Sequence, residues 1–165
     1  MSEQQPIRLR EGVRESDIEQ LRAVVESSGF FYDYEVEVAL DLASDCCQLV
    51  EGSEYRFLIA EDDKGIVGFT CFGAVLCTVA TYDVYWIAVH ERARGRGIGA
   101  QLMARTEELV AAARGTRIYV ETSGRAQYDP TRKFYEKLGY APAATLPDYY
   151  APGDDKVILF KVLSG

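Results

Sequence analysis

The sequence is poor in residues on which several enzyme classes depend. It has a single histidine, His90, so a Ser-His-Asp or Cys-His system would have to be built on that residue alone. None of its cysteines forms a C-x-x-C pair, and a reducing compartment would keep all of them as thiols. We therefore expect neither disulfides nor a metal site from these four residues, Cys46, Cys47, Cys71 and Cys77.

Basic residues and long apolar runs are scarce as well. Lys and Arg number 18 against 26 Asp and Glu, and the resulting formal net charge of −8 argues against nucleic acid as a partner. The most apolar stretch, 66–80, is shorter than the roughly 20 residues that span a bilayer, and we interpret it as buried strand. Residues 1–6 include Glu3 and no apolar run, unlike a secretory signal. We expect a cytoplasmic protein that binds neither nucleic acid nor a membrane.

The 165 residues, 48% of them hydrophobic, suit one domain, which we expect to span 1–165. Strand and helix patterns alternate along it. The expected strands are 7–10, 55–60, 66 onward, 82–89, 117–122, 140–146 and 156–163, with a hairpin turn at 61–65. The expected helices begin near Ser16, carry an apolar stripe from Val36 to Val50, span 98–113 and follow Asp129. The fold class is α/β (α+β), a mixed sheet of about seven strands with helices on both faces.

Local signals predict where several elements begin and end. Ser16 and Glu19 have the spacing of a capping box at a helix start. Asp129, which precedes a proline, is predicted to be the N-cap of a short helix that Gly139 ends. Residues 147–153, which contain two prolines and a glycine, predict a loop between the last two strands.

A glycine-rich segment separates strand 82–89 from helix 98–113. Its glycines allow a tight turn and leave bare N–H groups at a helix N-terminus, where phosphate binds readily. One interpretation is the dinucleotide fingerprint Gly95-x-Gly97-x-x-Ala100, with Glu121 about 20 residues further on. Against it, residues 90–94 separate the strand from Gly95, and the residues after Glu121 are too few for the rest of a doubly wound sheet.

The segment Arg94-x-x-Gly97-x-Gly99 instead resembles the pyrophosphate-binding signature of the GNAT acyltransferases, R/Q-x-x-G-x-G/A. The resemblance extends to W-I-A-V-H at 86–90 before the loop and to F-Y-E-K-L-G-Y at 134–140 after it. It implies the GNAT fold, acetyl-CoA as co-substrate and acetyl transfer to an amine. The cofactor-binding residues that it implies are Ile87, Ala88, Val89, Arg94, Gly95, Arg96, Gly97, Ile98, Gly99, Ala100 and Arg132.

The resemblance also implies catalytic residues. An amine of pKa about 10 is protonated at pH 7, so a base is expected. Asp83 matches a position where some family members carry a glutamate base. Glu121, which we slightly favour, matches the base of the bacterial ribosomal-protein N-terminal acetyltransferases. Tyr135 matches the family tyrosine that assists departure of the thiolate.

In this family the acceptor site is usually lined by the first two helices and the last hairpin. The corresponding aromatic residues here are Phe31, Tyr34, Tyr149 and Tyr150, in acidic surroundings that suit a cationic amine. A small amine, an amino compound and a peptide N-terminus all remain open as acceptors. The alternative to an enzyme is a non-catalytic acyl-CoA sensor of the same fold, and homodimers are common in the family.

Overall fold

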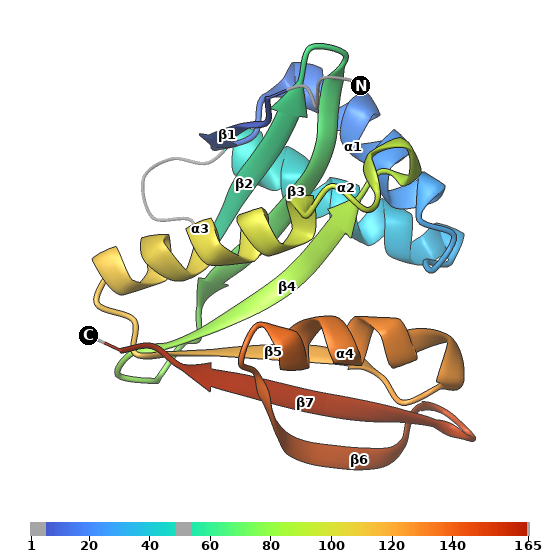
Figure 1. The fold of residues 1–165 in the computed structure, drawn as a ribbon, viewed down its shortest axis with the longest axis vertical. Helices are drawn as coiled ribbons and strands as arrows, with labels where there is room; N and C mark the ends of the chain where they lie inside the picture. The colour runs from blue at the N-terminus through green and yellow to red at the C-terminus, as the bar shows by residue number, and fades with distance from the viewer. Residues whose placement is uncertain (1–5, 49–53, 165) are drawn as a thin grey trace. The chain divides into compact units, whose positions relative to one another are not determined.

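The computed structural model describes residues 6–48 and 54–164 (Figure 1). In these residues the strands are β1 (Arg8–Glu11), β2 (Tyr55–Asp62), β3 (Gly65–Ala74), β4 (Thr81–Val89), β5 (Arg117–Ser123), β6 (Ala141–Ala151) and β7 (Asp154–Val162). The α-helices are α1 (Ile18–Ser27), α2 (Asp33–Gln48), α3 (Ile98–Ala112) and α4 (Asp129–Lys137). One sheet joins the seven described strands in the order β1-β2-β3-β4-β5-β7-β6. The fold class expected from the sequence is confirmed.

The chain divides into two compact units, and β4 and α3 each contribute to both. The first unit contains Met1–Gly73 and Trp86–Thr106, and the second contains Ala74–Tyr85 and Glu107–Gly165. Within the described residues, no helix is both long and apolar enough to cross a membrane.

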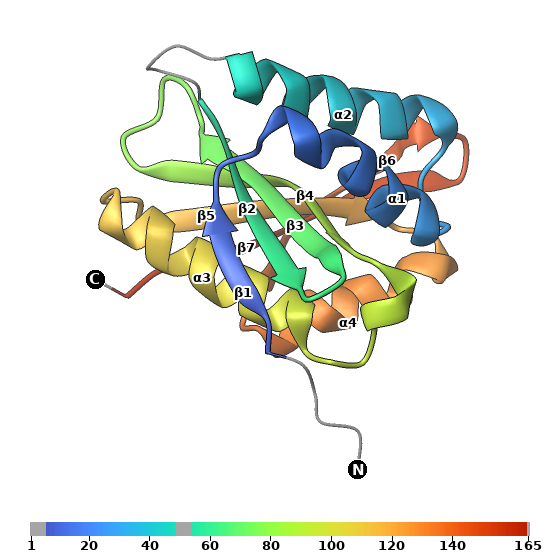
Figure 2. The ribbon, with the colours of Figure 1, turned by 90° about the horizontal axis from the view of Figure 1, so that it is seen from above.

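In the first unit, helices lie on both faces of the strands. Figure 2 shows α1 and α2 on one side of β1, β2 and β3, with α3 on the other. The α1–α2 side is closed by a buried apolar cluster that includes Val25, Leu40 and Phe69. The predicted apolar stripe of α2 is buried at Val36, Ala39, Leu40 and Ala43, whereas Val50 lies outside the described residues. On the α3 side, the buried hydroxyls of Thr70 and Thr106 share a hydrogen bond of 2.8 Å.

In the second unit, β5 pairs with a parallel and an antiparallel neighbour. Its register joins Arg117–Val120 to residues 81–84 of β4, and the whole of β5 to β7. Ile118, Val120 and Leu159 are buried on one face. On the other face, the half-buried rings of Tyr119 and Phe160 stack with their centres 5.7 Å apart.

Two predicted helix caps are wrong by position. A short 3-10 turn, Glu15–Asp17, precedes α1, and the Asp17 carboxylate accepts the N–H of Arg14 at 2.8 Å, so Ser16 and Glu19 form no capping box. The helix α4 begins at Asp129 itself, with Tyr128 at the N-cap position. The Asp129 carboxylate pairs with Arg132 instead of capping the backbone.

The predicted loop at 147–153 is mostly strand. β6 continues to Ala151. Its pairing with β7 is irregular at residues 147–150, between the paired residues Leu146 and Ala151. Asp148 adopts a φ of 53° there, and its carboxylate accepts the N–H of Gly153 at 2.7 Å. The stretch 66–80 is buried strand only as far as Gly73, since β3 ends at the exposed Ala74 and the following loop exposes Leu76 and Val79.

Candidate active site

In the first unit, the loop that leads into α3 has a backbone suited to an anion. Gly95 and Gly97 have φ values of 75° and 71°, which residues with side chains rarely adopt, and open space lies where a Cβ would stand. The first helical hydrogen bond of α3 runs from the N–H of Gln101 to the carbonyl of Gly97, at 3.1 Å. The N–H groups of residues 98–100 therefore have no acceptor in the helix, and they point from its positive end.

Asp62, at the end of β2, holds this loop. Its side chain is 1% exposed and accepts hydrogen bonds from Arg92 at 2.8 and 3.2 Å and from Arg96 at 3.3 Å. The N–H of Lys64 donates to the same carboxylate at 3.0 Å. The Arg92 hydrogen bond, with these other donors, lowers the pKa of Asp62 to about 2. We name this arrangement of Asp62, Arg92 and Arg96 the Asp62 clamp.

Other bonds fasten the loop to the end of α1. The guanidinium of Arg94 donates to the carbonyl of Ser28 at 2.9 Å, and the N–H of Glu91 donates to the Ser27 hydroxyl at 3.2 Å. The imidazole of His90 accepts the N–H of Arg92 at 3.2 Å, which is a structural role. Because the predicted cofactor ligands Arg94 and Arg96 already bind protein groups, what the loop chiefly offers a phosphate is its backbone N–H groups.

The end of β4, also in the first unit, lies against β3. Ala88 is buried, and Ile87 and Val89 are partly exposed. A Cβ on Gly68 would come within 2.9 Å of the Ala88 carbonyl oxygen, so this glycine permits the close approach of the two strands. The register between β4 and β5 ends at Val84, although β4 itself continues to Val89.

In the second unit, two carboxylates, two tyrosines and a lysine gather on neighbouring strands. The Lys156 ammonium lies 2.7 Å from a carboxylate oxygen of Glu121 and 4.3 Å from the centre of the Tyr149 ring. The Lys156 side chain is only 11% exposed, whereas that of Glu121 is 48% exposed. The Tyr149 and Tyr150 rings meet edge to face at 5.2 Å. With Asp83, these residues form what we call the acid–tyrosine cluster.

Electrostatics distinguishes the two carboxylates of the cluster. Burial raises the pKa of Asp83, the negative charge of Glu121 raises it further, and Lys156 partly opposes both effects. Burial lowers the pKa of Lys156, but its hydrogen bond to Glu121 and the charge of that carboxylate outweigh burial and raise it overall. Lys156 is therefore a firmly charged partner of Glu121, and Asp83 is a carboxylate with a raised pKa.

Tyr135, on α4 in the second unit, is buried with an available hydroxyl. Its ring lies 5.3 Å from that of Phe134 and 5.7 Å from that of Tyr140. Burial raises its pKa, so the hydroxyl keeps its proton. The Tyr140 hydroxyl donates to Glu107 at 3.1 Å, but the Tyr135 hydroxyl has no hydrogen-bond partner in residues 6–48 and 54–164.

The remaining predicted site residues lie in local arrangements of their own. In the first unit, the Phe31 ring packs against Trp86 at 5.0 Å, and the exposed Tyr34 ring stacks on Tyr32 at 5.5 Å. In the second unit, the Arg132 guanidinium donates to the carbonyls of Ser123 and Arg125 and pairs with Asp129, so it braces the start of α4.

Sequence reasoning missed two residues of these arrangements. Lys156, Ile158 and Phe160 alternate along β7 and therefore lie on one face of it. The sequence alone does not show that this face carries Glu121 as well, because that depends on the register between β7 and β5. Asp62 was assigned to a turn, and no local signal connects it to Arg92 and Arg96 about 30 residues away.

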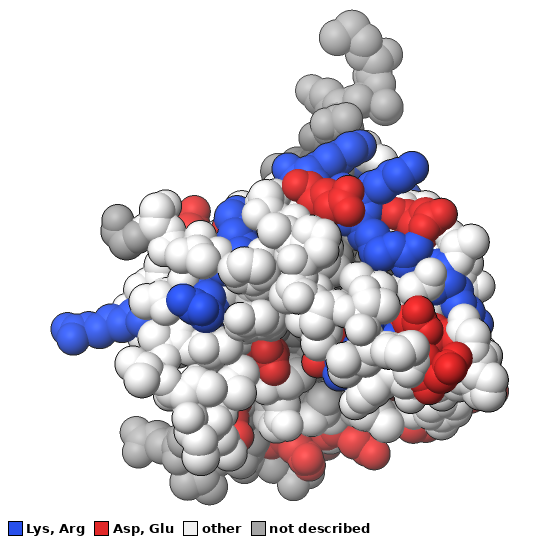
Figure 3. Space-filling view, turned by 90° about the horizontal axis from the view of Figure 1, so that it is seen from below, with Lys and Arg blue, Asp and Glu red and all other residues white. Residues whose placement is uncertain are grey.

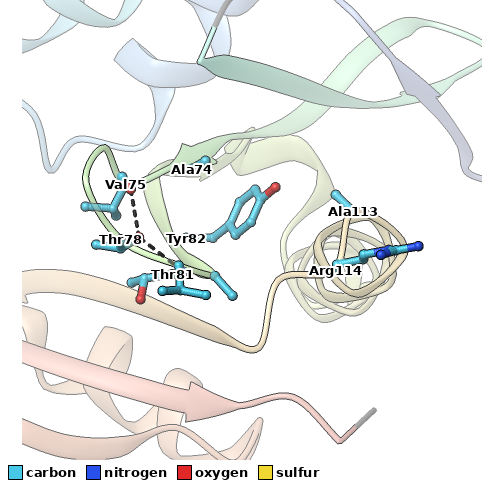
Figure 4. Close-up of a pocket in the computed structure, with 9 residues that line it drawn as sticks. Ala74, Val75, Thr78, Thr81, Tyr82, Ala113 and Arg114 are labelled. Carbon is cyan, nitrogen blue, oxygen red and sulfur yellow. Dashed lines mark hydrogen bonds between the residues drawn. The ribbon is translucent and has the colours of Figure 1, made fainter.

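A small cavity in the second unit lies elsewhere. It has a volume of about 130 Å³ and is lined by the loop after β3, the start of β4 and the end of α3. Figure 4 shows the Tyr82 ring between the Thr78 loop and α3. No residue predicted for catalysis, cofactor or acceptor lines this cavity. The described residues also contain no group of three or more His, Cys, Asp or Glu that could hold a metal.

Comparison with known proteins identifies the class. The family model described as an acetyltransferase (GNAT) domain matches residues 53–142. A putative GNAT acetyltransferase of Desulfovibrio desulfuricans, whose crystal structure is known, is 36% identical, with a TM-score of 0.93 over 96% of this chain and 100% of that one. An aminoglycoside 6'-N-acetyltransferase solved with coenzyme A is 19% identical, with a TM-score of 0.75 over 96% of this chain and 98% of that one. The last likeness shows the fold alone.

An uncharacterized N-acetyltransferase of Methanocaldococcus jannaschii is 29% identical over 105 residues, which are 64% of this chain and 65% of that protein. The matched part thus spans slightly less than two thirds of that relative's length. The chain belongs to the GNAT acetyltransferase family.

Proposed function

We propose that this protein transfers an acetyl group from acetyl-CoA to a primary amine. The observation that carries the proposal is the loop before α3. Two glycines with a left-handed backbone conformation turn this loop so that the first N–H groups of the helix are open to a phosphate, and the chain belongs to a family of acetyltransferases. The coenzyme A complex of one structural neighbour supports an acyl-CoA ligand.

We assign binding of acetyl-CoA to backbone groups. The N–H groups of Ile98, Gly99 and Ala100 would hold the pyrophosphate, and the strand end at Ile87–Val89 would pair with the pantetheine amides. The Asp62 clamp keeps the loop in the conformation that these contacts need, because it fixes two loop arginines to β2.

We assign the base to Asp83. An amine of pKa about 10 costs roughly 4 kcal/mol to deprotonate at pH 7, so a group that accepts its proton lowers the barrier. Glu121, which the sequence slightly favours as the base, has its carboxylate in an ion pair with Lys156. No ion pair is found for Asp83 in the described residues. Glu121 then acts on Asp83 through its charge, which raises the pKa of Asp83.

Tyr135 would assist the leaving group. As the acceptor nitrogen bonds to the acetyl carbon and the carbon–sulfur bond breaks, the sulfur gains negative charge. A thiol of pKa about 8.5 gives a thiolate that is a weaker base than a phenolate of pKa about 10, so Tyr135 donates a hydrogen bond and keeps its proton. The unpaired hydroxyl of this buried residue suits the role.

Thermal unfolding tests the cofactor assignment. Acetyl-CoA at about 100 times its Kd should stabilise the protein by roughly 2.7 kcal/mol, and NAD should not. Gly97→Val should lose most of that shift. Gly12→Val is the matched control, because Gly12 also has a positive φ, 82°, with open space at its Cβ position and lies outside the loop. Equal acetyl-CoA shifts in both variants would contradict the loop assignment.

Turnover tests the enzyme against the sensor alternative. Thiol release from acetyl-CoA is measured with simple amines, amino-acid amides, a peptide N-terminus and an aminoglycoside, which is the substrate class of one structural neighbour. An enzyme releases thiol above the no-acceptor rate with at least one of them. Binding of acetyl-CoA without release would favour the sensor.

A further inference from the structure

The acid–tyrosine cluster contains a position for a positive charge that the chain itself fills. The Lys156 ammonium has a carboxylate at 2.7 Å on one side and an aromatic ring at 4.3 Å on another. Carboxylates and ring faces are the groups that bind a ligand's ammonium. Because the Lys156 side chain is largely buried, this ammonium is a fixed part of the site rather than a mobile surface charge.

We propose that Lys156 is a specificity-determining residue, which fills the cation position between Glu121 and Tyr149 and so makes the enzyme prefer acceptors with a single ammonium over diamines. The inference rests on the proposed function, since it assumes that the cluster receives the acceptor. It goes further by defining the substrate class through charge.

The charge balance of the cluster supports the proposal. Two carboxylates, Asp83 and Glu121, face one lysine, so one negative charge is left for the incoming amine. A second ammonium on the acceptor would meet Lys156 where it would otherwise find Glu121, and two like charges at that position repel. Removing Lys156 frees Glu121 and the Tyr149 ring for that second ammonium.

The edge strand next to this position adds no positive charge. β6 carries only one charged residue, Asp148, and every residue of the strand is exposed. Figure 3 shows one face of the molecule, where uncharged atoms cover much of the surface and several acidic side chains lie among them. The exposed, largely uncharged and partly aromatic residues of β6 suit the carbon chain of a monoamine.

The same strand as Lys156 offers a matched control. Lys161 on β7 pairs with Glu107 at 2.8 Å and lies 5.7 Å from the centre of the Tyr140 ring, so its surroundings repeat those of Lys156 with other residues. Neither Glu107 nor Tyr140 belongs to the acid–tyrosine cluster.

The experiment compares kcat/KM for an accepted monoamine and for its analogue with a second ammonium, of which pentylamine and 1,5-diaminopentane are the simplest pair. The measured quantity is the monoamine-to-diamine ratio of kcat/KM, corrected for the two equivalent amines of the diamine. In Lys156→Met the ratio should fall by about tenfold or more, the size expected when the diamine forms a charge-assisted hydrogen bond with Glu121. In Lys156→Arg and Lys161→Met it should stay within about threefold of the parent ratio.

A ratio unchanged in Lys156→Met would overturn the proposal, as would an equal fall in Lys161→Met, which would indicate a general charge effect. If Lys156→Met does not fold, Lys156→Gln, which keeps a polar side chain of similar reach, gives the same comparison. If the parent acetylates no amine, the proposed function fails and this inference with it. Acetylation of the monoamine with an unchanged ratio defeats this inference alone.

Discussion

Tyr135 differs from the other tyrosine in its ring cluster by a single hydrogen bond. The Tyr140 hydroxyl binds Glu107, whereas the Tyr135 hydroxyl has no partner in the described residues. Tyr135→Phe should therefore change the free energy of unfolding by less than about 1 kcal/mol but lower kcat at least tenfold, with acetyl-CoA affinity nearly unchanged. Tyr140→Phe is the control, and it should cost about 1 kcal/mol of stability and leave kcat close to parental. A parental kcat in Tyr135→Phe would remove the acid role.

Asp83 should set the acid limb of the pH–rate profile. Burial and Glu121 raise its pKa, and a base stops working as the pH falls through its pKa. With a peptide acceptor, whose α-amine has a pKa of about 8, log kcat/KM should be nearly flat between pH 8 and the pKa of Asp83, because Asp83 takes the proton of the bound ammonium, and should fall with slope 1 below the pKa of Asp83. Asp83→Asn can use only the neutral amine and should instead fall with slope 1 from pH 8 downwards, and a parental profile in that variant would exclude Asp83 as the base.

The neighbours of Asp83 should move that limb in opposite directions. Glu121→Gln removes a negative charge and should shift it to lower pH, because ionised Asp83 is then less disfavoured. Lys156→Met removes a positive charge and should shift it to higher pH, because ionised Asp83 then loses a stabilising neighbour. Profiles measured on the two variants with the same acceptor check the signs, and shifts in one common direction would mean that the limb belongs to another group.

At the scale of elements, the Asp62 clamp joins the end of β2 to the loop before α3. Its carboxylate is almost fully buried and its pKa falls from 3.8 to about 2, which corresponds to about 2 kcal/mol of folding free energy. Since the folded-state pKa is the lower one, this contribution is complete above about pH 4 and is lost as the pH falls towards 2. Asp62→Asn should lower stability at pH 7 by about that amount and weaken acetyl-CoA binding.

Denaturant unfolding at pH 7 and at pH 2, with calorimetric titration of acetyl-CoA at pH 7, checks the Asp62 prediction. The parent and Asp62→Asn should differ at neutral pH and converge in acid. Unchanged acetyl-CoA affinity in a destabilised variant would show that the clamp supports the fold without ordering the loop.

Sequence patterns sufficed for elements whose signals are local. The apolar period and the glycines around α3, and the β-branched and aromatic residues of β4, place those elements within a residue or two of their observed bounds. The sequence predicts too short a β6 because Pro147 and Pro152 indicate a loop, and the bonds that join Asp148 to Gly153 and Asp155 carry no sequence signal. The sequence did not indicate the Asp62 clamp or the Glu121–Lys156 pair for a related reason, since both depend on contacts between residues far apart in sequence.

At the scale of the whole molecule, the charge balance acts on every approaching ligand. A formal net charge of −8 attracts cations over distances that salt shortens to about 10 Å at 0.1 M. Only a ligand with a net charge of its own responds to this field. The acceptor proposed here is a cation until it reaches the base, so its association should depend on ionic strength.

The dependence of kcat/KM on salt therefore distinguishes long-range attraction by the net charge of the protein from interactions within the site. With acetyl-CoA saturating, kcat/KM for pentylamine should fall several-fold as NaCl rises from about 0.05 to about 0.5 M, because screening weakens the attraction of a cation to an acidic protein. A zwitterion of the same length, 5-aminopentanoate, has no net charge and should show a much flatter dependence, whatever its absolute rate. The two amines present the same nucleophile to Asp83, so a difference in slope reports charge rather than chemistry. Parallel slopes would mean that salt acts on the catalytic groups themselves, and the net charge would then have no part in acceptor capture.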